Sequence, residues 1–183
     1  TAAHYNGKIP RNPFAMYHVD PDHKEREFLT LDELTAMTEI KLEDPNMAFA
    51  RDLFIFGCWT GISFIDIKNL TEDNISMING APWIVSKRQK TGVPFQIKLM
   101  DIPMQIIGRY KAFRKGSHLF NIGNLDSINK RIKKVAAMCG IKKRVSFHVS
   151  RHSWAVLALE YGMPIESVSK IPVSYTHLTL PTI

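Results

Sequence analysis

The run from Ser146 to His152 places a histidine and an arginine three residues apart. At this spacing His148 and Arg151 would lie on one side of a helical turn. An arginine can grip a phosphate with two parallel hydrogen bonds, and a histidine can donate one more. A helix that begins here adds the partial positive charge of its N-terminus. The spacing is a weak signal by itself, and a helix start with scattered polar residues is the simpler alternative.

Two further groups of residues could take part in chemistry. Lys90 lies in a basic stretch, residues 87–92, between two segments with strand character. A lysine at a hairpin tip can reach into a groove and act as a general acid, although an ordinary solvated turn accounts for the same residues. Ser63 and Asp66 have the spacing of an N-terminal capping box, which explains both without any chemistry.

The charge of the chain favours a polyanionic partner. Its 24 lysines and arginines outnumber its 17 acidic residues, which gives a net charge of +7. Nucleic acid is the first candidate for such a partner, and a basic protein without one is the alternative. The basic residues cluster over 109–115, 130–134 and 142–144. The two cysteines have no metal-binding or redox spacing, so both are expected to be buried apolar residues.

Hydrophobic periodicity and turn residues predict the elements that must position these groups. Thr30 and Glu33 form a capping box that opens the first helix, and Asn79-Gly80 is a hairpin turn. Helices are predicted over 31–41, 45–57, 63–70, 103–114, 125–139, 149–161 and from 163, and strands over 74–78, 82–88 and 93–99. The fold class is therefore α+β, mainly α-helical, with a small three-stranded antiparallel β-meander.

The length of 183 residues fits one domain at about 150 residues per domain. Residues 1–26 are polar, contain three prolines and are predicted to be a linker. No stretch reaches the roughly 18 apolar residues of a membrane span, and no secretory signal is visible. We therefore expect a cytoplasmic protein that does not associate with membranes.

The order of these motifs resembles the catalytic domain of the tyrosine recombinase/integrase (phage integrase) family, most closely the integrases of Bacteroidetes mobile elements. The resemblance covers about residues 27–171. It is carried by Phe28-Leu29-Thr30, Thr60-Gly61, Gln89-Lys90-Thr91 and the pairs Phe147-His148 and Arg151-His152. It implies that 1–26 is a linker or remnant of a core-binding domain, that 27–171 is an incomplete catalytic domain, and that 172–183 is a tail foreign to the family, possibly an artefact.

The resemblance also implies a function and roles for residues. The family recombines DNA site-specifically, by strand cleavage and rejoining through a 3′-phosphotyrosyl intermediate, so the resemblance implies no metal and no cofactor. Lys90 would protonate the leaving 5′-hydroxyl, and His148 and Arg151 would bind the scissile phosphate. Asp66 matches an acidic family position, and His152 would support the site. Duplex DNA is the implied partner, bound by a tetramer of the parent protein in a bacterial cytoplasm. DNA contacts are expected from Lys87, Arg88, Lys130, Arg131, Lys142, Lys143 and Arg144.

Two departures from the family pattern are visible. Ser63 stands at the position of the family's first arginine and cannot supply its charge. The family's tyrosine nucleophile should fall near Ile183, where there is none, and Tyr175 is only a weak candidate because it comes too early. We therefore expect this chain to bind DNA without completing cleavage.

Two alternatives remain open. One is a non-catalytic DNA-binding or recombination-regulating protein with the same fold, and the other is a basic nucleic-acid-binding domain with chance motifs. The catalytic hypothesis requires Lys90 and Arg151 on the same face. It also expects Phe147, Trp154, Leu157 and Leu159 to be mostly core or inter-helix contacts.

Overall fold

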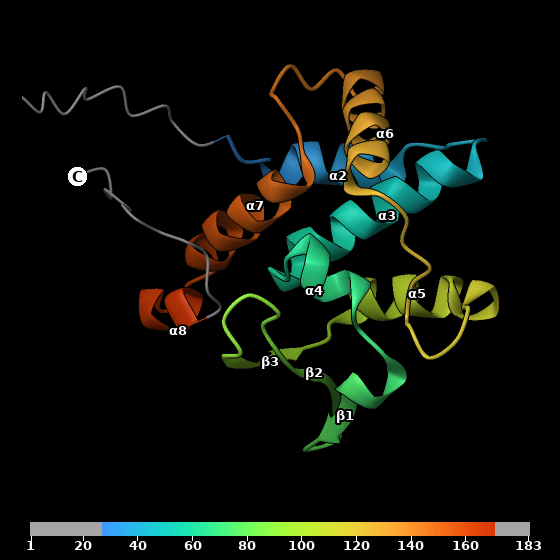
Figure 1. Cartoon of the computed structure of the whole chain (residues 1–183). Coiled ribbons are helices and arrows are strands. Elements are labelled where there is room, and N and C mark those ends of the chain that lie inside the picture. The colour runs from blue at the N-terminus through green and yellow to red at the C-terminus, as the bar shows by residue number, and fades with distance from the viewer. Residues whose placement is uncertain (1–26, 171–183) are drawn as a thin grey trace, which may run out of the picture.

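A computed structural model describes residues 27–170, in which the helices pack together and a small sheet lies at one edge of them (Figure 1). The expectations for residues 1–26, for Tyr175 and for the tail 172–183 fall outside the described residues. The fold class is confirmed as mainly helical with a three-stranded antiparallel sheet. The helices are α2 (Leu31–Glu39), α3 (Pro45–Thr60), α4 (Phe64–Lys68), α5 (Asp101–Arg109), α6 (Leu125–Met138), α7 (Phe147–Glu160) and α8 (Ile165–Lys170), with short 3-10 helices η1 (Glu72–Asn74) and η2 (Lys111–Phe113).

Helix α3 forms the centre of the domain and contacts α2, α5, α6 and α7. It begins at Pro45, after the Asp44 side chain caps the N–H of Asn46. The sequence predicts that it ends at Gly57, but it continues to Thr60. The helix stops only at Gly61, whose φ of 66° is the left-handed conformation that terminates helices and suits glycine.

Gly57 instead allows α7 to pack closely against α3. A Cβ atom at position 57 would lie 2.5 Å from Oγ of Ser150 in α7. Gly61 has a similar role, because a Cβ there would lie 2.6 Å from the Trp154 ring. Both glycines therefore set the distance between α3 and the helix that carries His148 and Arg151.

The sheet is the predicted meander, with strands β1 (Ile75–Ile78), β2 (Ala81–Lys87) and β3 (Pro94–Lys98) in the order β1-β2-β3. Asn79 and Gly80 turn between β1 and β2 with φ of 50° and 76°, as a type I′ turn requires. Ile84 pairs with Ile75 on one side and Ile97 on the other, and it is fully buried. The turn between β2 and β3 holds Lys90.

Helix α5 begins at Asp101, two residues before the predicted start at Pro103. The proline therefore lies in the first turn, where its missing N–H breaks no helical hydrogen bond. The helix ends at Arg109, and the predicted continuation to 114 is a separate 3-10 turn, η2.

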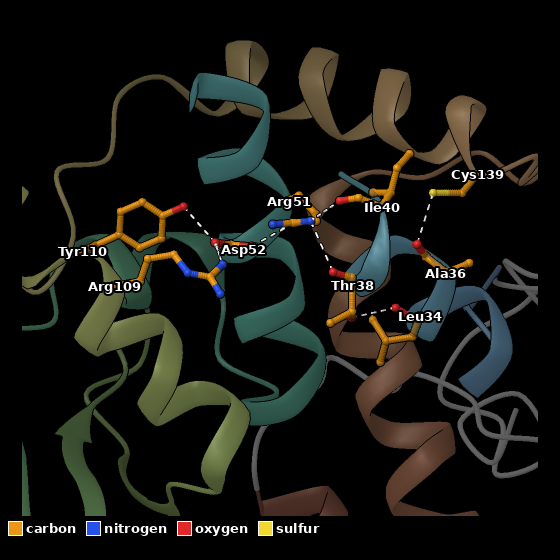
Figure 2. Close-up of polar contacts among 9 residues, drawn as sticks. All are labelled: Leu34, Ala36, Thr38, Ile40, Arg51, Asp52, Arg109, Tyr110 and Cys139. Carbon is orange, nitrogen blue, oxygen red and sulfur yellow. Dashed lines mark hydrogen bonds and ion pairs between the residues drawn. The ribbon is translucent and has the colours of Figure 1, made fainter. Parts of the chain in front are cut away.

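A polar cluster around the buried Asp52 joins α2, α3 and α5 (Figure 2). Asp52 in α3 accepts hydrogen bonds from its neighbour Arg51 (2.8 Å), from Arg109 (2.5 Å) and from the Tyr110 hydroxyl (2.8 Å). Arg51 also donates to the carbonyl of Ile40 just after α2, at 2.8 Å. Burial and the bond to Asp52 raise the pKa of Tyr110. The cluster fixes α2 and α5 on the central helix.

Candidate active site

The starts of α4, α6 and α7 meet around a hollow of about 310 Å³. Arg151, which is 7% exposed, lines this hollow together with His148, which is exposed. The N-termini of α6 and α7, each with partial positive charge, therefore lie beside an arginine and a histidine. Such a surface suits an anion. The other lining residues are Ser63, Phe64, Ile65, Leu125, Asn129, Ser146 and Phe147.

Helix α7 is held firmly where it presents these two residues. It begins at Phe147, two residues earlier than predicted, and the Phe147 N–H donates to the Asn129 side chain of α6 at 2.7 Å. The Phe147 ring packs edge-on against Phe64 of α4, with centroids 5.2 Å apart. Further along, the Ser153 hydroxyl accepts from the Leu29 N–H at 2.8 Å. Arg151 thus projects from a backbone that is fixed before any ligand arrives.

The remaining expectations for α7 concern its packing and His152. Phe147 and Trp154 are buried and Leu157 and Leu159 are partly buried, as expected. His152 is 7% exposed, and its ring meets that of His148 edge-on with centroids 4.6 Å apart. It can therefore restrict the position of the His148 ring.

Asp66 ties the turn that carries Lys90 to the helix that lines the hollow. One carboxylate oxygen accepts from the Gln89 N–H at 2.9 Å, and the other accepts from the Ser63 hydroxyl at 2.6 Å. Lys90 is the next residue after Gln89, and it is exposed. The Asp66 carboxylate therefore links the turn to Ser63, which lines the hollow.

The capping pattern at Ser63 is only half of the expected box. Ser63 is the N-cap of α4, and its hydroxyl accepts from the Asp66 N–H at 3.3 Å. The Asp66 carboxylate does not complete the box, because it bonds the turn at residues 88 and 89 instead. This second role of Asp66 spans 22 and 23 residues, so no local spacing could reveal it.

Arg88 is buried, although the sequence predicts that it contacts DNA. Its exposed fraction is only 5%. Its Nη1 forms an ion pair with Asp66 at 3.1 Å, and its guanidinium lies 4.9 Å from the centroid of the Phe95 ring. Burial lowers the pKa of Arg88, and Asp66 opposes that shift. Its Nε and Nη2 have no hydrogen-bond partner among the described residues.

The other basic residues predicted to contact DNA differ in exposure. Lys87, Lys130, Lys142 and Arg144 are exposed. Arg131 is half-buried and hydrogen-bonds Ser127. Lys143 is half-buried and pairs with Glu33 at 2.6 Å, so its charge already stabilises the start of α2.

Within residues 27–170, no cluster of three or more histidine, cysteine or acidic side chains could hold a metal ion. In the same part of the chain, no helix combines the length and the apolar character needed to cross a membrane.

The comparisons with known proteins agree with the geometry. The model of the phage integrase family matches residues 27–172. This range covers most of the chain, so the chain belongs to the phage integrase family. No curated protein matches the sequence significantly.

Several solved structures share the fold at low sequence identity. A XerA recombinase superposes with a TM-score of 0.66 at 20% identity, over 89% of this chain and 57% of that one. The Tn1549 transposon integrase, solved with circular intermediate DNA, gives 0.66 at 17% identity, over 93% and 65%. A lambda integrase dimer bound to a core site gives 0.68 at 16% identity, over 94% and 67%. The chain thus spans little more than half of the XerA chain.

Proposed function

We propose that this chain is the catalytic domain of a site-specific DNA recombinase, which cuts and rejoins duplex DNA through a 3′-phosphotyrosyl intermediate. One observation carries the proposal: His148 and Arg151 line an anion-suited hollow whose Ser63 is joined through Asp66 to the turn that holds Lys90. Family membership and the DNA complexes among the structural relatives support it.

Each of the three residues has a role in this reaction. A tyrosine oxygen attacks the scissile phosphorus, and the bond from phosphorus to the 5′-oxygen breaks. Arg151 and His148 donate hydrogen bonds to the phosphate oxygens, which carry more charge in the pentavalent transition state. Lys90 gives a proton to the leaving 5′-oxygen. The tyrosine stays bonded to the 3′-phosphate until the 5′-hydroxyl of a partner strand attacks the phosphorus, which releases the tyrosine and joins the exchanged strands.

The nucleophile lies outside the described residues. In this proposal residues 27–171 form the catalytic domain, residues 1–26 lead from an upstream domain, and 172–183 do not supply the family tyrosine. The parent protein, a bacterial integrase of the Bacteroidetes type, then works as a tetramer on DNA with its own tyrosine. Ser63 leaves the site with one cation fewer than the family pattern.

The test uses the whole chain and nicked duplexes that trap covalent intermediates. We expect the chain to bind these duplexes, to lose affinity when Arg151 is changed to alanine, and to form no adduct that survives SDS. A covalent adduct that disappears in Tyr175→Phe would show that the nucleophile has been misplaced. Absence of any binding to duplex DNA would contradict the proposal as a whole.

The alternative is a non-catalytic protein that binds DNA or regulates recombination with the same fold. Ser63, in place of an arginine, favours this alternative. The two functions differ in the parent protein, which should form a covalent adduct that requires Lys90 if it is an enzyme. A parent protein that binds the same duplexes and never forms an adduct would favour the alternative.

A further inference from the structure

A second, smaller hollow lies at the other end of α4 from the candidate active site. Its volume is about 100 Å³. Among the described residues that line it, five are basic or carry a hydrogen-bonding side chain and none is acidic. Cationic and amide groups from two separate segments therefore surround one small space. These five residues are Lys68, Asn69, Lys115, His118 and Asn121.

The two segments that form this hollow are fixed to each other by the backbone. The N–H of Leu119 donates to the carbonyl of Leu70 at 2.8 Å, and residues 71 and 118 form an antiparallel bridge. Beneath them Phe120 lines the hollow and is 2% exposed. In Figure 1 the second segment is the yellow trace that leads into α6. The hollow is thus preformed, which lowers the entropic cost of binding a ligand.

Helix α4 connects the two hollows. Ser63, its N-cap, lines the first hollow, and Lys68, its last residue, lines the second. The rise of 1.5 Å per helical residue separates these two positions by about 7.5 Å along the helix axis. One strand of duplex DNA spans such a length within a few nucleotides, so a single strand can contact both hollows.

We infer that this second hollow binds a backbone phosphodiester of the DNA whose scissile phosphate occupies the Arg151 hollow. Lys68 and Lys115 neutralise the phosphate, and the side chains of Asn69, His118 and Asn121 offer hydrogen bonds. The contact carries no sequence information, but it fixes the register of the strand relative to Arg151. The inference rests on the proposed function, since it needs duplex DNA as the ligand.

The experiment compares two double variants with equal loss of charge. Lys68→Gln/Lys115→Gln removes both lysines of the hollow, and Lys41→Gln/Lys98→Gln removes two exposed lysines that line neither hollow. Affinity for a fluorescent duplex is measured by anisotropy from about 50 to 200 mM salt. We expect the hollow variant to bind roughly tenfold more weakly and its salt slope to fall by about 0.9, the contribution of the one phosphate contact that is lost. The control should keep the wild-type slope.

The outcomes separate this inference from the proposed function. Equal slopes for the two double variants, with wild-type thermal unfolding, would overturn the inference and leave DNA binding intact. Failure of the wild-type chain to bind any duplex would overturn the proposed function and this inference with it. A melting temperature lowered in the hollow variant alone calls for the single variants Lys68→Gln and Lys115→Gln, each of which should weaken binding and reduce the slope by no more than the double variant does.

Discussion

The Asp66 carboxylate connects three separate parts of the site. It accepts from the Ser63 hydroxyl, from Arg88 and from the Gln89 N–H. A single carboxylate thereby holds the cap of α4, a buried guanidinium and the turn of Lys90. The position of Lys90 relative to the hollow depends on this carboxylate.

Asp66→Asn should therefore reduce both stability and cleavage by the parent protein. The side chains of Arg88 and Asp66 are each 5% exposed, so loss of the carboxylate leaves a buried, unpaired cation. Breaking such a pair costs about 3 kcal/mol. Urea unfolding measures the free energy of unfolding of each variant. Asp66→Asn/Arg88→Met should recover part of the loss, because no buried charge remains; a double variant as unstable as the sum of the single ones would contradict the account.

The two cysteines should differ in reactivity. Cys58 is 2% exposed, and burial raises its pKa well above the usual value. A reagent therefore cannot reach its sulfur, and the thiol stays protonated. Cys139 is partly exposed, and burial raises its pKa as well. A chromogenic disulfide reagent at pH 8 should label Cys139 slowly and Cys58 only after denaturation. Rapid labelling of Cys58 in the native protein would show that the core around α3 opens.

At the scale of elements, the fit between α3 and α7 sets the position of Arg151. Gly57→Ala should destabilise the protein, because the new Cβ would meet Ser150 Oγ at 2.5 Å. Overpacking costs about 1–3 kcal/mol and outweighs the gain of up to about 1 kcal/mol from helix propensity. Gly108→Ala in α5, with nothing within 4 Å of its Cβ, is the matched control and should be neutral or stabilising. Equal melting temperatures for both variants would contradict this packing.

The start of α2 gives a pH-dependent contribution to stability. Burial tends to raise the pKa of Glu33, but hydrogen bonds to Lys143 and the Thr30 N–H lower it below its usual 4.5. The contribution is therefore full above pH 4.5 and is lost as the pH falls through the lower folded pKa. Glu33→Gln should lower stability at pH 7 by about 0.5–1 kcal/mol, as expected for a partly exposed cap and ion pair. The difference in the free energy of unfolding between Glu33→Gln and wild type should vanish near pH 3. A difference that stays constant with pH would contradict this role of Glu33.

Local spacing predicted most elements and few of the contacts between them. The Thr30 and Glu33 box, the Asn79-Gly80 turn and the three-stranded meander follow from residues close in sequence, and all are observed. The predicted end of α3 at Gly57 was wrong, because this glycine allows α7 to pack closely and does not end the helix. Gly57 and Ser150 are 93 positions apart, so no local pattern contains this contact. The burial of Arg88 was missed for the same reason, since its partner lies 22 residues away.

At the scale of the whole molecule, the net charge of +7 includes basic side chains that line two hollows. The hollow of His148 and Arg151 suits the scissile phosphate, and the hollow of Lys68 and Lys115 suits another phosphate of the same DNA. They lie at the two ends of α4, which Asp66 joins to the turn of Lys90. The short helix α4 is therefore the element around which a bound strand would be aligned.

Lys90 and Arg151 are proposed to act on the same phosphate. The most direct test uses a duplex that the wild-type chain binds, in which each phosphate in turn is replaced by a neutral methylphosphonate. The affinity of each such duplex is measured for the wild-type chain, for Lys90→Ala and for Arg151→Ala. We expect one position at which neutralisation weakens wild-type binding and has little further effect on either variant. Coupling of the two residues to phosphates several nucleotides apart, or to none, would contradict it.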